Sequence, residues 1–159
     1  MKKINLTRGA VAIVDDKDYE KLSKHRWYYN QGYALRAITL DSGNQAWIKM
    51  HTAIMGKIKG LEIDHINGDR LDNRKENLRH VTHLQNVQNK ASDKNTSSQY
   101  KGVHWCKERK RWKSQIAIDG KHYHLGLYRN EKDAAYVYNV WAEYFFGAYA
   151  RLNTVTEGI

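Results

Sequence analysis

Residues 61–90 constrain the fold more than any other part of the chain, because short apolar runs alternate there with turn-forming Asp, Asn and Gly. The apolar spacing in 61–65 and 78–81 predicts two short strands, and the polar stretch between them predicts a loop. Thr82 and Gln85 have the spacing of a capping box, so a helix should begin directly after Thr82. The segment is therefore expected to form a strand, a loop, a second strand and a helix.

Four polar residues of this unit have side chains suited to catalysis. The first strand ends at Asp64 and His65, the loop ends at Asn77, and the helix carries Asn86. The oxygens of Asp64 and Asn86 suit Mg²⁺ or Mn²⁺ rather than zinc, and an ion held by two protein oxygens keeps positions open for phosphate and water. The imidazole of His65, with an ordinary pKa of about 6.5, suits a general base at neutral pH. Together these groups could hydrolyse a phosphodiester.

Each residue also has a plainer interpretation when taken alone. An Asp-His pair is more often a surface turn, Asn77 a turn residue and Asn86 a helix-surface residue. The joint pattern favours a site, because His65 precedes Asn77 by 12 positions and Asn86 by 21. Of the other histidines, His51 is a candidate support behind the site, and His83 is a less favoured ligand.

The segment carries Asp-His at 64–65, Asn-Gly-Asp at 67–69, Asp-Asn-Arg at 72–74, Asn-Leu-Arg at 77–79, Val-Thr at 81–82 and Gln-Asn at 85–86. With these elements it closely resembles the phage and intron-encoded branch of the HNH endonucleases. Short stretches at 6–7, 14–16, 27–28 and 50–51 also look like that branch. The resemblance implies a ββα-metal nuclease fold.

The resemblance also implies a role for each site residue. His65 would be the general base that activates the attacking water. Asp64 and Asn86 would hold one divalent metal, Mg²⁺ or Mn²⁺, against the scissile phosphate and the leaving 3′ oxygen. Asn77 would orient His65 through a backbone hydrogen bond, and the products would carry 5′-phosphate and 3′-hydroxyl ends. An Asp before the first His and an Asn in place of the last His depart from the founding motif, but both occur within this branch.

Residues on either side of this segment predict further elements. Before it, alternation predicts strands at 10–14, 26–29, 33–39 and 46–50, with a helix at 16–24 and a turn at 41–44. After it, residues 91–99 are small and polar, which is a linker composition. We therefore expect an α+β protein: a nuclease domain with an N-terminal β-rich region at 1–90, a linker at 91–99, and a second domain at 100–153.

The second domain is expected to be a three-stranded antiparallel sheet packed on one helix. Strands are predicted at 100–106, 112–118 and 121–128, and a helix at 131–146. Asp119-Gly120 is a strong hairpin signal, Asn130 is placed to cap the helix, and Gly147 is placed to end it. Four residues share one helical face and are expected to pack on the sheet: Ala134, Tyr138, Trp141 and Phe145.

Within this domain the stretches 100–105, 112–116, 124–128, 134–135 and 151–153 resemble the plant ethylene-response-factor (Apetala) DNA-binding domain. The resemblance implies that the exposed sheet face lies in the DNA major groove and contacts bases. His104 and Ala117 stand where the plant pattern has Arg, and the first loop is one residue longer, so the plant base specificity is not carried over.

The charge of this domain agrees with a DNA partner. Between 101 and 129 there are eight Lys or Arg against Glu108 and Asp119, and they lie on strands and loops. The contact candidates are Lys101, His104, Trp105, Arg109, Arg111, Trp112, Lys113, Gln115, His122 and His124. Trp112 has packing as its alternative role, and residues 107–111 have a solvated hairpin loop as theirs.

The whole chain carries 27 Lys and Arg against 17 Asp and Glu, a net charge of +10, which predicts a polyanionic partner, namely double-stranded DNA. No long apolar run favours a membrane, and no signal peptide follows Met1, so we expect a cytoplasmic protein of a bacterium or a phage-infected cell. Cys106 is the only cysteine, which excludes an internal disulfide and a Cys-built zinc site.

The sequence therefore predicts a metal-dependent DNA endonuclease that nicks DNA or acts as a homing enzyme. One active site per chain should cut one strand, and cutting both would need a homodimer or sequential binding events. One alternative is a non-catalytic DNA-binding regulator with a degenerate nuclease domain, against which the intact four-residue motif argues. Another is a structure-directed or non-specific nuclease acting on RNA or branched DNA, which the motif does not separate from the first prediction.

Overall fold

The computed structural model describes residues 1–91 and 96–155, and the chain divides into two compact units, Met1–Asn86 and Val87–Ile159. Both units combine helices and strands, so the predicted α+β class is confirmed. Of the predicted linker, residues 92–95 lie outside the described residues. Within the described residues, no helix has both the length and the apolar character that crossing a membrane requires.

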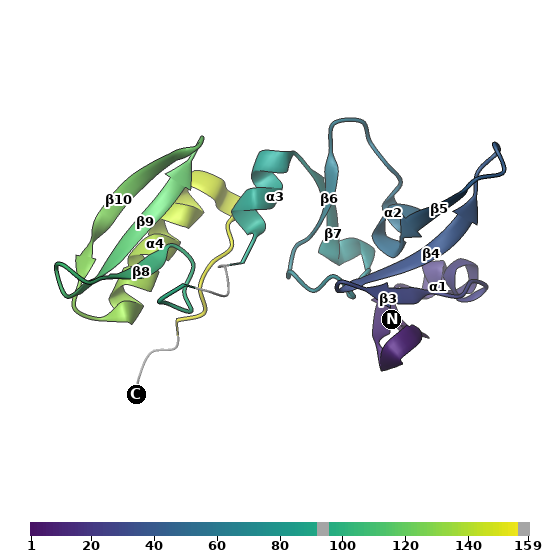
Figure 1. Cartoon of the computed structure of the whole chain (residues 1–159), viewed down its shortest axis with the longest axis horizontal. Helices are drawn as coiled ribbons and strands as arrows, with labels where there is room; N and C mark the ends of the chain where they lie inside the picture. Colours follow the sequence, from purple (N-terminus) through teal and green to yellow (C-terminus); the bar gives the residue numbers. More distant parts are fainter. Residues whose placement is uncertain (92–95, 156–159) are drawn as a thin grey trace. The chain divides into compact units, whose positions relative to one another are not determined.

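Figure 1 shows the elements in chain order. The first unit contains β1 (Lys2–Asn5), η1 (Thr7–Gly9), β2 (Val11–Val14), α1 (Asp16–Ser23), β3 (Tyr28–Asn30), β4 (Tyr33–Thr39), β5 (Gln45–Lys49), α2 (Met50–Met55), β6 (Glu62–His65), η2 (Lys75–Asn77) and β7 (Leu78–Val81). Helix α3 (His83–Asn89) begins in this unit. The second unit contains β8 (Val103–Cys106), β9 (Arg111–Ile118), β10 (Lys121–Tyr128), α4 (Glu131–Phe146) and η3 (Gly147–Tyr149).

The first unit has three small antiparallel sheets: β1–β2, β3–β4–β5 and β6–β7. Its core comes from the N-terminal 50 residues and is centred on Trp27, which is 1% exposed and whose indole N–H donates to the carbonyl of Leu22 at 2.8 Å. Met50 closes this core from the start of α2. Strand β1 and helix α2 are additions to the predicted elements, and the strand predicted at 46–50 ends at Lys49.

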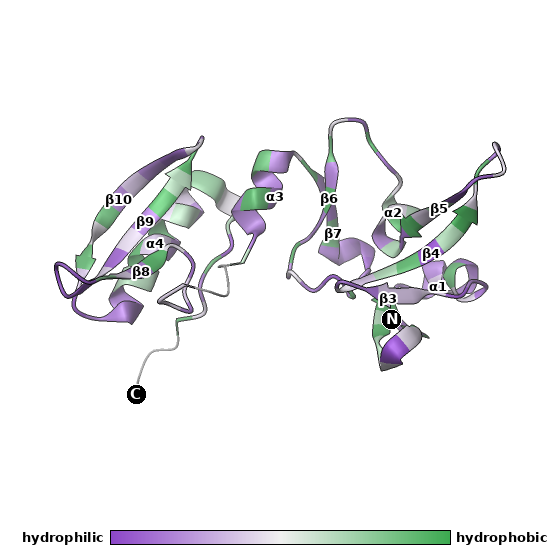
Figure 2. Ribbon diagram, viewed as in Figure 1, coloured by the Kyte–Doolittle hydropathy of each residue, from purple (hydrophilic) through white to green (hydrophobic). Residues whose placement is uncertain are grey.

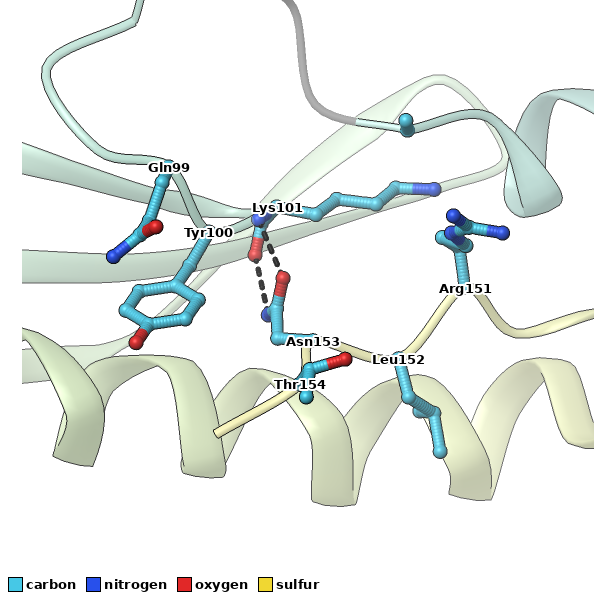
Figure 3. Close-up of a pocket in the computed structure, with 8 residues that line it drawn as sticks. Gln99, Tyr100, Lys101, Arg151, Leu152, Asn153 and Thr154 are labelled. Carbon is cyan, nitrogen blue, oxygen red and sulfur yellow. Dashed lines mark hydrogen bonds between the residues drawn. The ribbon is translucent and has the colours of Figure 1, made fainter. Parts of the chain in front are cut away.

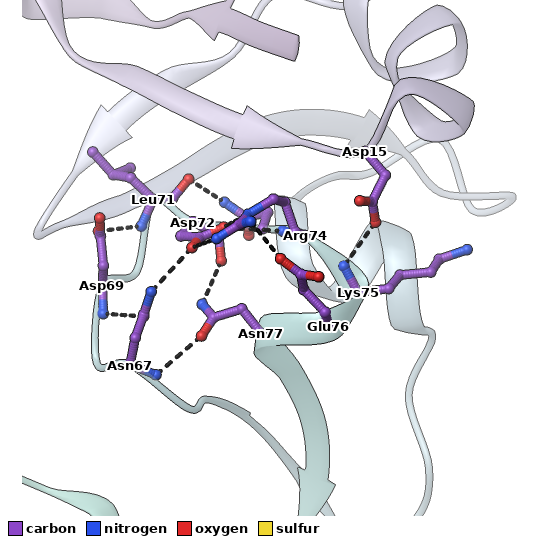
Figure 4. Close-up of polar contacts among 10 residues, drawn as sticks. Asp15, Asn67, Asp69, Leu71, Asp72, Arg74, Lys75, Glu76 and Asn77 are labelled. Atoms are coloured by element: carbon purple, nitrogen blue, oxygen red, sulfur yellow. Dashed lines mark hydrogen bonds and ion pairs between the residues drawn. The ribbon is translucent and has the colours of Figure 1, made fainter. Parts of the chain in front are cut away.

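Strand β2 connects this core to the loop between β6 and β7. The backbone N–H of Ile13 donates to Leu71 at 2.8 Å, and its carbonyl accepts from Asn73 at 2.8 Å. The carboxylate of Asp15 accepts from the backbone N–H of Lys75 at 2.8 Å (Figure 4). The loop is therefore held along one edge by a strand that is distant in sequence.

In the second unit the strand order is β10–β9–β8, with α4 against the sheet (Figure 1). The β9–β10 turn has Asp119 at φ 49° and Gly120 at φ 76°, the left-handed pair that a two-residue hairpin requires. The side chain of Asn130 caps α4 by accepting from the N–H of Lys132 at 3.0 Å. The loop between β8 and β9 is hydrophilic throughout (Figure 2).

One expectation for α4 is wrong. Trp141 and Phe145 are 41% and 45% exposed, and they stack on each other with ring centroids 5.7 Å apart rather than packing on the sheet. The buried side chains are Ala134, Ala135, Tyr138, Ala142 and Phe146. The buried stripe thus follows every fourth residue from Ala134, and its alanines let the helix lie close to a sheet that is only three strands wide.

The C-terminal segment is fixed to the sheet and helix by two asparagines. The side chain of Asn153 accepts from the backbone N–H of Lys101 at 2.7 Å and donates to its carbonyl at 3.1 Å (Figure 3). The side chain of Asn139 on α4 binds the backbone of Asn153 in the same way, at 2.7 and 2.9 Å. These bonds satisfy backbone groups that no strand pairs.

We predict that Gly102→Ala destabilises the second unit far more than Gly120→Ala. Both glycines have φ +76°, so the backbone strain is matched, at about 1 kcal/mol. A Cβ at Gly102 would lie 2.0 Å from Cδ2 of Tyr138 and 2.6 Å from the carbonyl oxygen of Gln115, whereas Gly120 has no atom within 4 Å. Overpacking should add roughly 1–3 kcal/mol at Gly102 alone. Urea unfolding followed by circular dichroism measures both losses, and equal losses would contradict the packing described.

Candidate functional site

The β6–β7 hairpin places Asp64 and His65 at its end. Register pairs Asp64 with Arg79 and His65 with Leu78, and both site residues are buried. Because successive strand residues point to opposite faces, Glu62 and Asp64 share one face of the hairpin while His65 belongs to the other. Burial of the ring lowers the pKa of His65, while the side-chain contact with Asn73 and the charge of Asp64 partly oppose that shift.

The charge of Asp64 is balanced from the neighbouring strand. Oδ2 of Asp64 accepts from Nη2 of Arg79 at 2.8 Å and from Nε at 3.0 Å. Both side chains are largely buried, so this ion pair is screened less than a surface pair. Arg79 therefore balances the charge of a buried carboxylate at the end of β6.

Glu62, which the sequence analysis did not single out, joins β6 to α3. One carboxylate oxygen accepts from the side-chain amide nitrogen of Asn86, and the other pairs with Nδ1 of His83 at 2.8 Å. These two contacts, that with Asn86 first, lower the pKa of Glu62. Because the amide nitrogen of Asn86 binds Glu62, its amide oxygen is the atom that can face a ligand. The signal in the sequence was the position of Glu62 two residues before Asp64 on one strand face.

Asn77 fixes the backbone that follows His65. Its side-chain oxygen accepts from the N–H of Asn67 at 3.0 Å, and its side-chain nitrogen donates to the carbonyl of Asp72 at 2.8 Å. Its own carbonyl accepts from the N–H of Ile66 at 2.9 Å. Asn77 thus binds both ends of the loop and the residue after His65 (Figure 4).

Asp72 organises the same loop from inside. Its carboxylate, 4% exposed, accepts from Nη2 and Nε of Arg74 at 2.7 and 2.8 Å and from the amide of Asn67 at 3.0 Å. The Arg74 guanidinium holds the pKa of Asp72 below its usual range. The partners of Asp72 depend on how the loop closes, so the sequence alone indicates only that Asp72 belongs to a turn-forming stretch.

Behind the base, His51 of α2 contacts His65, with ring centroids 5.0 Å apart at 70°. Tyr33 contacts both rings, at 5.5 Å from His51 and 6.3 Å from His65. Burial, together with the charges of His65 and Lys49, lowers the pKa of His51 to about 3. His51 is therefore a neutral imidazole packed against the site at neutral pH.

In the second unit, register separates the predicted contact residues by face. His104 pairs with Lys113, Gln115 with His124 and Ala117 with His122. By strand alternation, one face, here termed the polar sheet face, carries His104, Arg111, Lys113, Gln115, His122 and His124. Val103, Ser114 and Ile116 on the other face are buried. A pocket of about 560 Å³ lies on part of the polar sheet face, with Val87 and Lys90 in its lining.

The four remaining candidates lie elsewhere. Trp105 pairs with Trp112 on the face that carries Val103, and Trp112 packs on the cluster of Tyr100 and Val103. Arg109 is exposed in the loop before β9. The remaining candidate, Lys101, is half-buried.

The Nζ of Lys101 donates to the carbonyl of Gln88. Burial, with the charges of Arg151 and Lys90, lowers the pKa of Lys101 to about 8. Figure 3 shows the Lys101 and Arg151 side chains lining one pocket, of about 250 Å³. Lys101 precedes β8 and so has no strand position on the polar sheet face, but it also lines the larger pocket with His104 and Gln115.

Comparison with known proteins agrees with the geometry of the first unit. Residues 48–88 match the family model described as HNH endonuclease. The chain is 32% identical over 152 residues to "Uncharacterized HNH endonuclease L560" of Acanthamoeba polyphaga mimivirus, covering 93% of this chain and 77% of the relative. It is 32% identical over 105 residues to "Protein 3.8" of Escherichia phage T7, covering 65% of this chain and 86% of the relative. No solved structure matches the chain.

We predict that His51 makes the first unit less stable in mild acid. Its pKa is about 6.5 when unfolded and about 3 when folded, so the unfolded chain binds the extra proton. Stability is therefore full above pH 6.5 and falls as the pH drops below it. Between about pH 7.5 and pH 5, His51→Leu should remove about 2 kcal/mol of this loss.

Urea unfolding at the two pH values measures the effect. His25→Leu, at an exposed histidine, is the matched control and should keep the wild-type pH dependence. An unchanged pH dependence in His51→Leu would show that His51 is protonated in the folded unit.

Proposed function

Because this chain belongs to the HNH endonucleases, we propose that it hydrolyses phosphodiester bonds of double-stranded DNA with one divalent metal and His65 as general base. The observation that carries this proposal is the bond from the Asn86 amide to Glu62. It leaves the amide oxygen of Asn86 free to act as a donor together with the carboxylate of Asp64, which shares one face of β6 with Glu62.

The donor set fits a hard divalent cation. Asp64 and Asn86 offer oxygens, which suit Mg²⁺ or Mn²⁺. Within the described residues no cluster of three or more His, Cys, Asp or Glu could hold a metal, so the pair of Asp64 and Asn86 is the candidate. A bound divalent ion would supply Lewis-acid stabilisation of the scissile phosphate and of the leaving 3′ oxygen.

The chain's own residues would carry the remaining steps. The neutral imidazole of His65 would take the proton of the attacking water. Asn77 would hold the backbone after His65, and Arg79 would balance the charge of Asp64. Hydrolysis would leave 5′-phosphate and 3′-hydroxyl ends. One active site per chain would nick a single strand, and cutting both would use a homodimer or sequential binding.

The second unit would dock on DNA through the polar sheet face, as the resemblance to the ethylene-response-factor domain suggests. In support, this face gathers six of the ten candidate contact residues, including Arg111 and Lys113. A β surface of this width can enter the major groove. Docking would raise the concentration of the nuclease unit at nearby phosphates, as a sequence-directed homing enzyme requires.

We expect wild-type protein to nick supercoiled plasmid with Mg²⁺ or Mn²⁺, and His65→Ala to bind plasmid but cleave about 10²–10⁴-fold more slowly, because the base is lost. His25→Ala is the matched control and should cleave at the wild-type rate. Gel electrophoresis gives the rates, and end-labelling identifies the products.

Each contrary outcome has a distinct meaning. Full-rate cleavage by His65→Ala would overturn the base assignment. A mobility shift without cleavage by the wild type would favour the non-catalytic regulator. Cleavage of RNA or branched DNA in place of duplex DNA would favour the third alternative.

We also expect Lys113→Gln to weaken binding to duplex DNA, because Lys113 lies on the polar sheet face. Losing one phosphate contact should lower the slope of log affinity against log salt by about 0.9. Lys132→Gln on α4 removes the same charge from the helix and should leave the slope unchanged. Fluorescence anisotropy across a salt series measures both, and equal slopes would exclude Lys113 from the interface.

A further inference from the structure

Two cations gather on one aromatic ring beside the general base. The ring is that of Tyr33, the first residue of β4. Nζ of Lys49 lies 4.1 Å from its centroid, and the guanidinium carbon of Arg70 lies 4.6 Å from it. The same ring lies 6.3 Å from that of His65 and 5.5 Å from that of His51. Two positively charged side chains therefore contact the same ring that contacts His65.

The two cations come from different elements that the fold brings together. Lys49 is the last residue of β5, and Arg70 belongs to the loop between β6 and β7. Nη1 of Arg70 donates to the carbonyl of Gln31 at 3.2 Å. Its side chain also lies against Gly32, where a Cβ would stand 3.4 Å from Cδ of Arg70. The β3–β4 turn thus fixes where the Arg70 side chain lies.

Two of the three carboxylates of this region are paired with other cations, and the third, that of Asp69, accepts from the backbone N–H of Leu71 at 2.9 Å. Asp64 pairs with Arg79, and Asp72 pairs with Arg74. Among residues 1–91 and 96–155, neither Lys49 nor Arg70 has a carboxylate within 4.0 Å. Two like charges that contact one ring repel each other, and a bound anion would offset that repulsion. Both side chains are exposed, so an incoming ligand can reach them.

We propose that Lys49 and Arg70 together bind a non-scissile phosphate of the DNA strand being cut, with Tyr33 as their shared support. The guanidinium of Arg70 would contact two phosphate oxygens, and Lys49 would supply a point charge. Tyr33, in contact with both cations and with His65, would set the spacing between the bound phosphate and the base. Lys49 and Arg70 are binding residues, and the inference rests on the proposed function for the DNA substrate.

The test is duplex DNA binding by the full chain in EDTA, which separates binding from cleavage. Lys49→Gln and Arg70→Gln should each weaken binding roughly 5–20-fold and lower the salt slope by about 0.9, and the double variant by about 1.8. Lys21→Gln on α1 removes the same charge elsewhere in the unit and serves as the matched control. Tyr33→Phe keeps the ring and should bind as wild type, whereas Tyr33→Ala should bind like the double variant.

Thermal unfolding of each variant reports whether the fold is intact. Because Lys49 is exposed, Lys49→Gln should unfold at the wild-type temperature. Lys49→Gln and Arg70→Gln slopes equal to that of Lys21→Gln would overturn the proposal, as would absence of duplex binding by the wild type. Loss of binding in these variants, with no cleavage by the wild type in Mg²⁺ or Mn²⁺, would support the phosphate site while refuting the proposed catalysis. Cleavage by the wild type, with salt slopes unaltered in the Lys49 and Arg70 variants, would support the proposed catalysis and refute the phosphate site.

Discussion

The loop between β6 and β7 has little apolar surface, so its shape depends on satisfying its own backbone with side-chain hydrogen bonds. Asn77 binds backbone groups of residues 67 and 72, and Asp72 binds Arg74 and Asn67. Asn77 and Asp72 are buried, so leaving either side chain without its partners would cost about 1–3 kcal/mol. The position of His65 follows from this network, since the loop begins directly after it. The geometry of the candidate site thus depends on polar bonds more than on the hydrophobic core.

Local sequence patterns correctly predicted the helices and strands whose bounds depend on residues within the element itself. Both bonds of the capping box form, from the N–H of Thr82 to Gln85 at 2.9 Å and back at 3.3 Å. The bounds of β4, β7, β10 and α4 agree with the predicted ranges. Periodicity could not identify β1, which is defined by pairing with β2. It also could not decide which of two apolar stripes of α4 meets the sheet, and the stripe with small residues is the one that does.

The candidate site likewise contains residues that the local sequence identified and residues that only the folded structure reveals. Asp64, His65 and Asn86 could be named from the motif, because their spacing reflects one continuous strand–loop–strand–helix segment. Their roles in catalysis remain predictions. Glu62 has its contacts on a helix 21 or more positions away, and Tyr33 reaches His65 from another sheet. Contacts of that range depend on how separate elements pack, which a single sequence does not report.

The binding of this loop to β2 has a consequence for how the nuclease unit is assembled. The bond from Lys75 to Asp15 spans 60 residues, and the ladder between Ile13 and Asn73 is of similar range. Contacts so distant in sequence are entropically costly unless one partner is already ordered. The β1–β2 hairpin leaves the ribosome before this loop and is formed by contacts close in sequence. It would then serve as a folding template, so that substitutions in β1 or β2 could slow maturation of the nuclease without touching any residue of its chemistry.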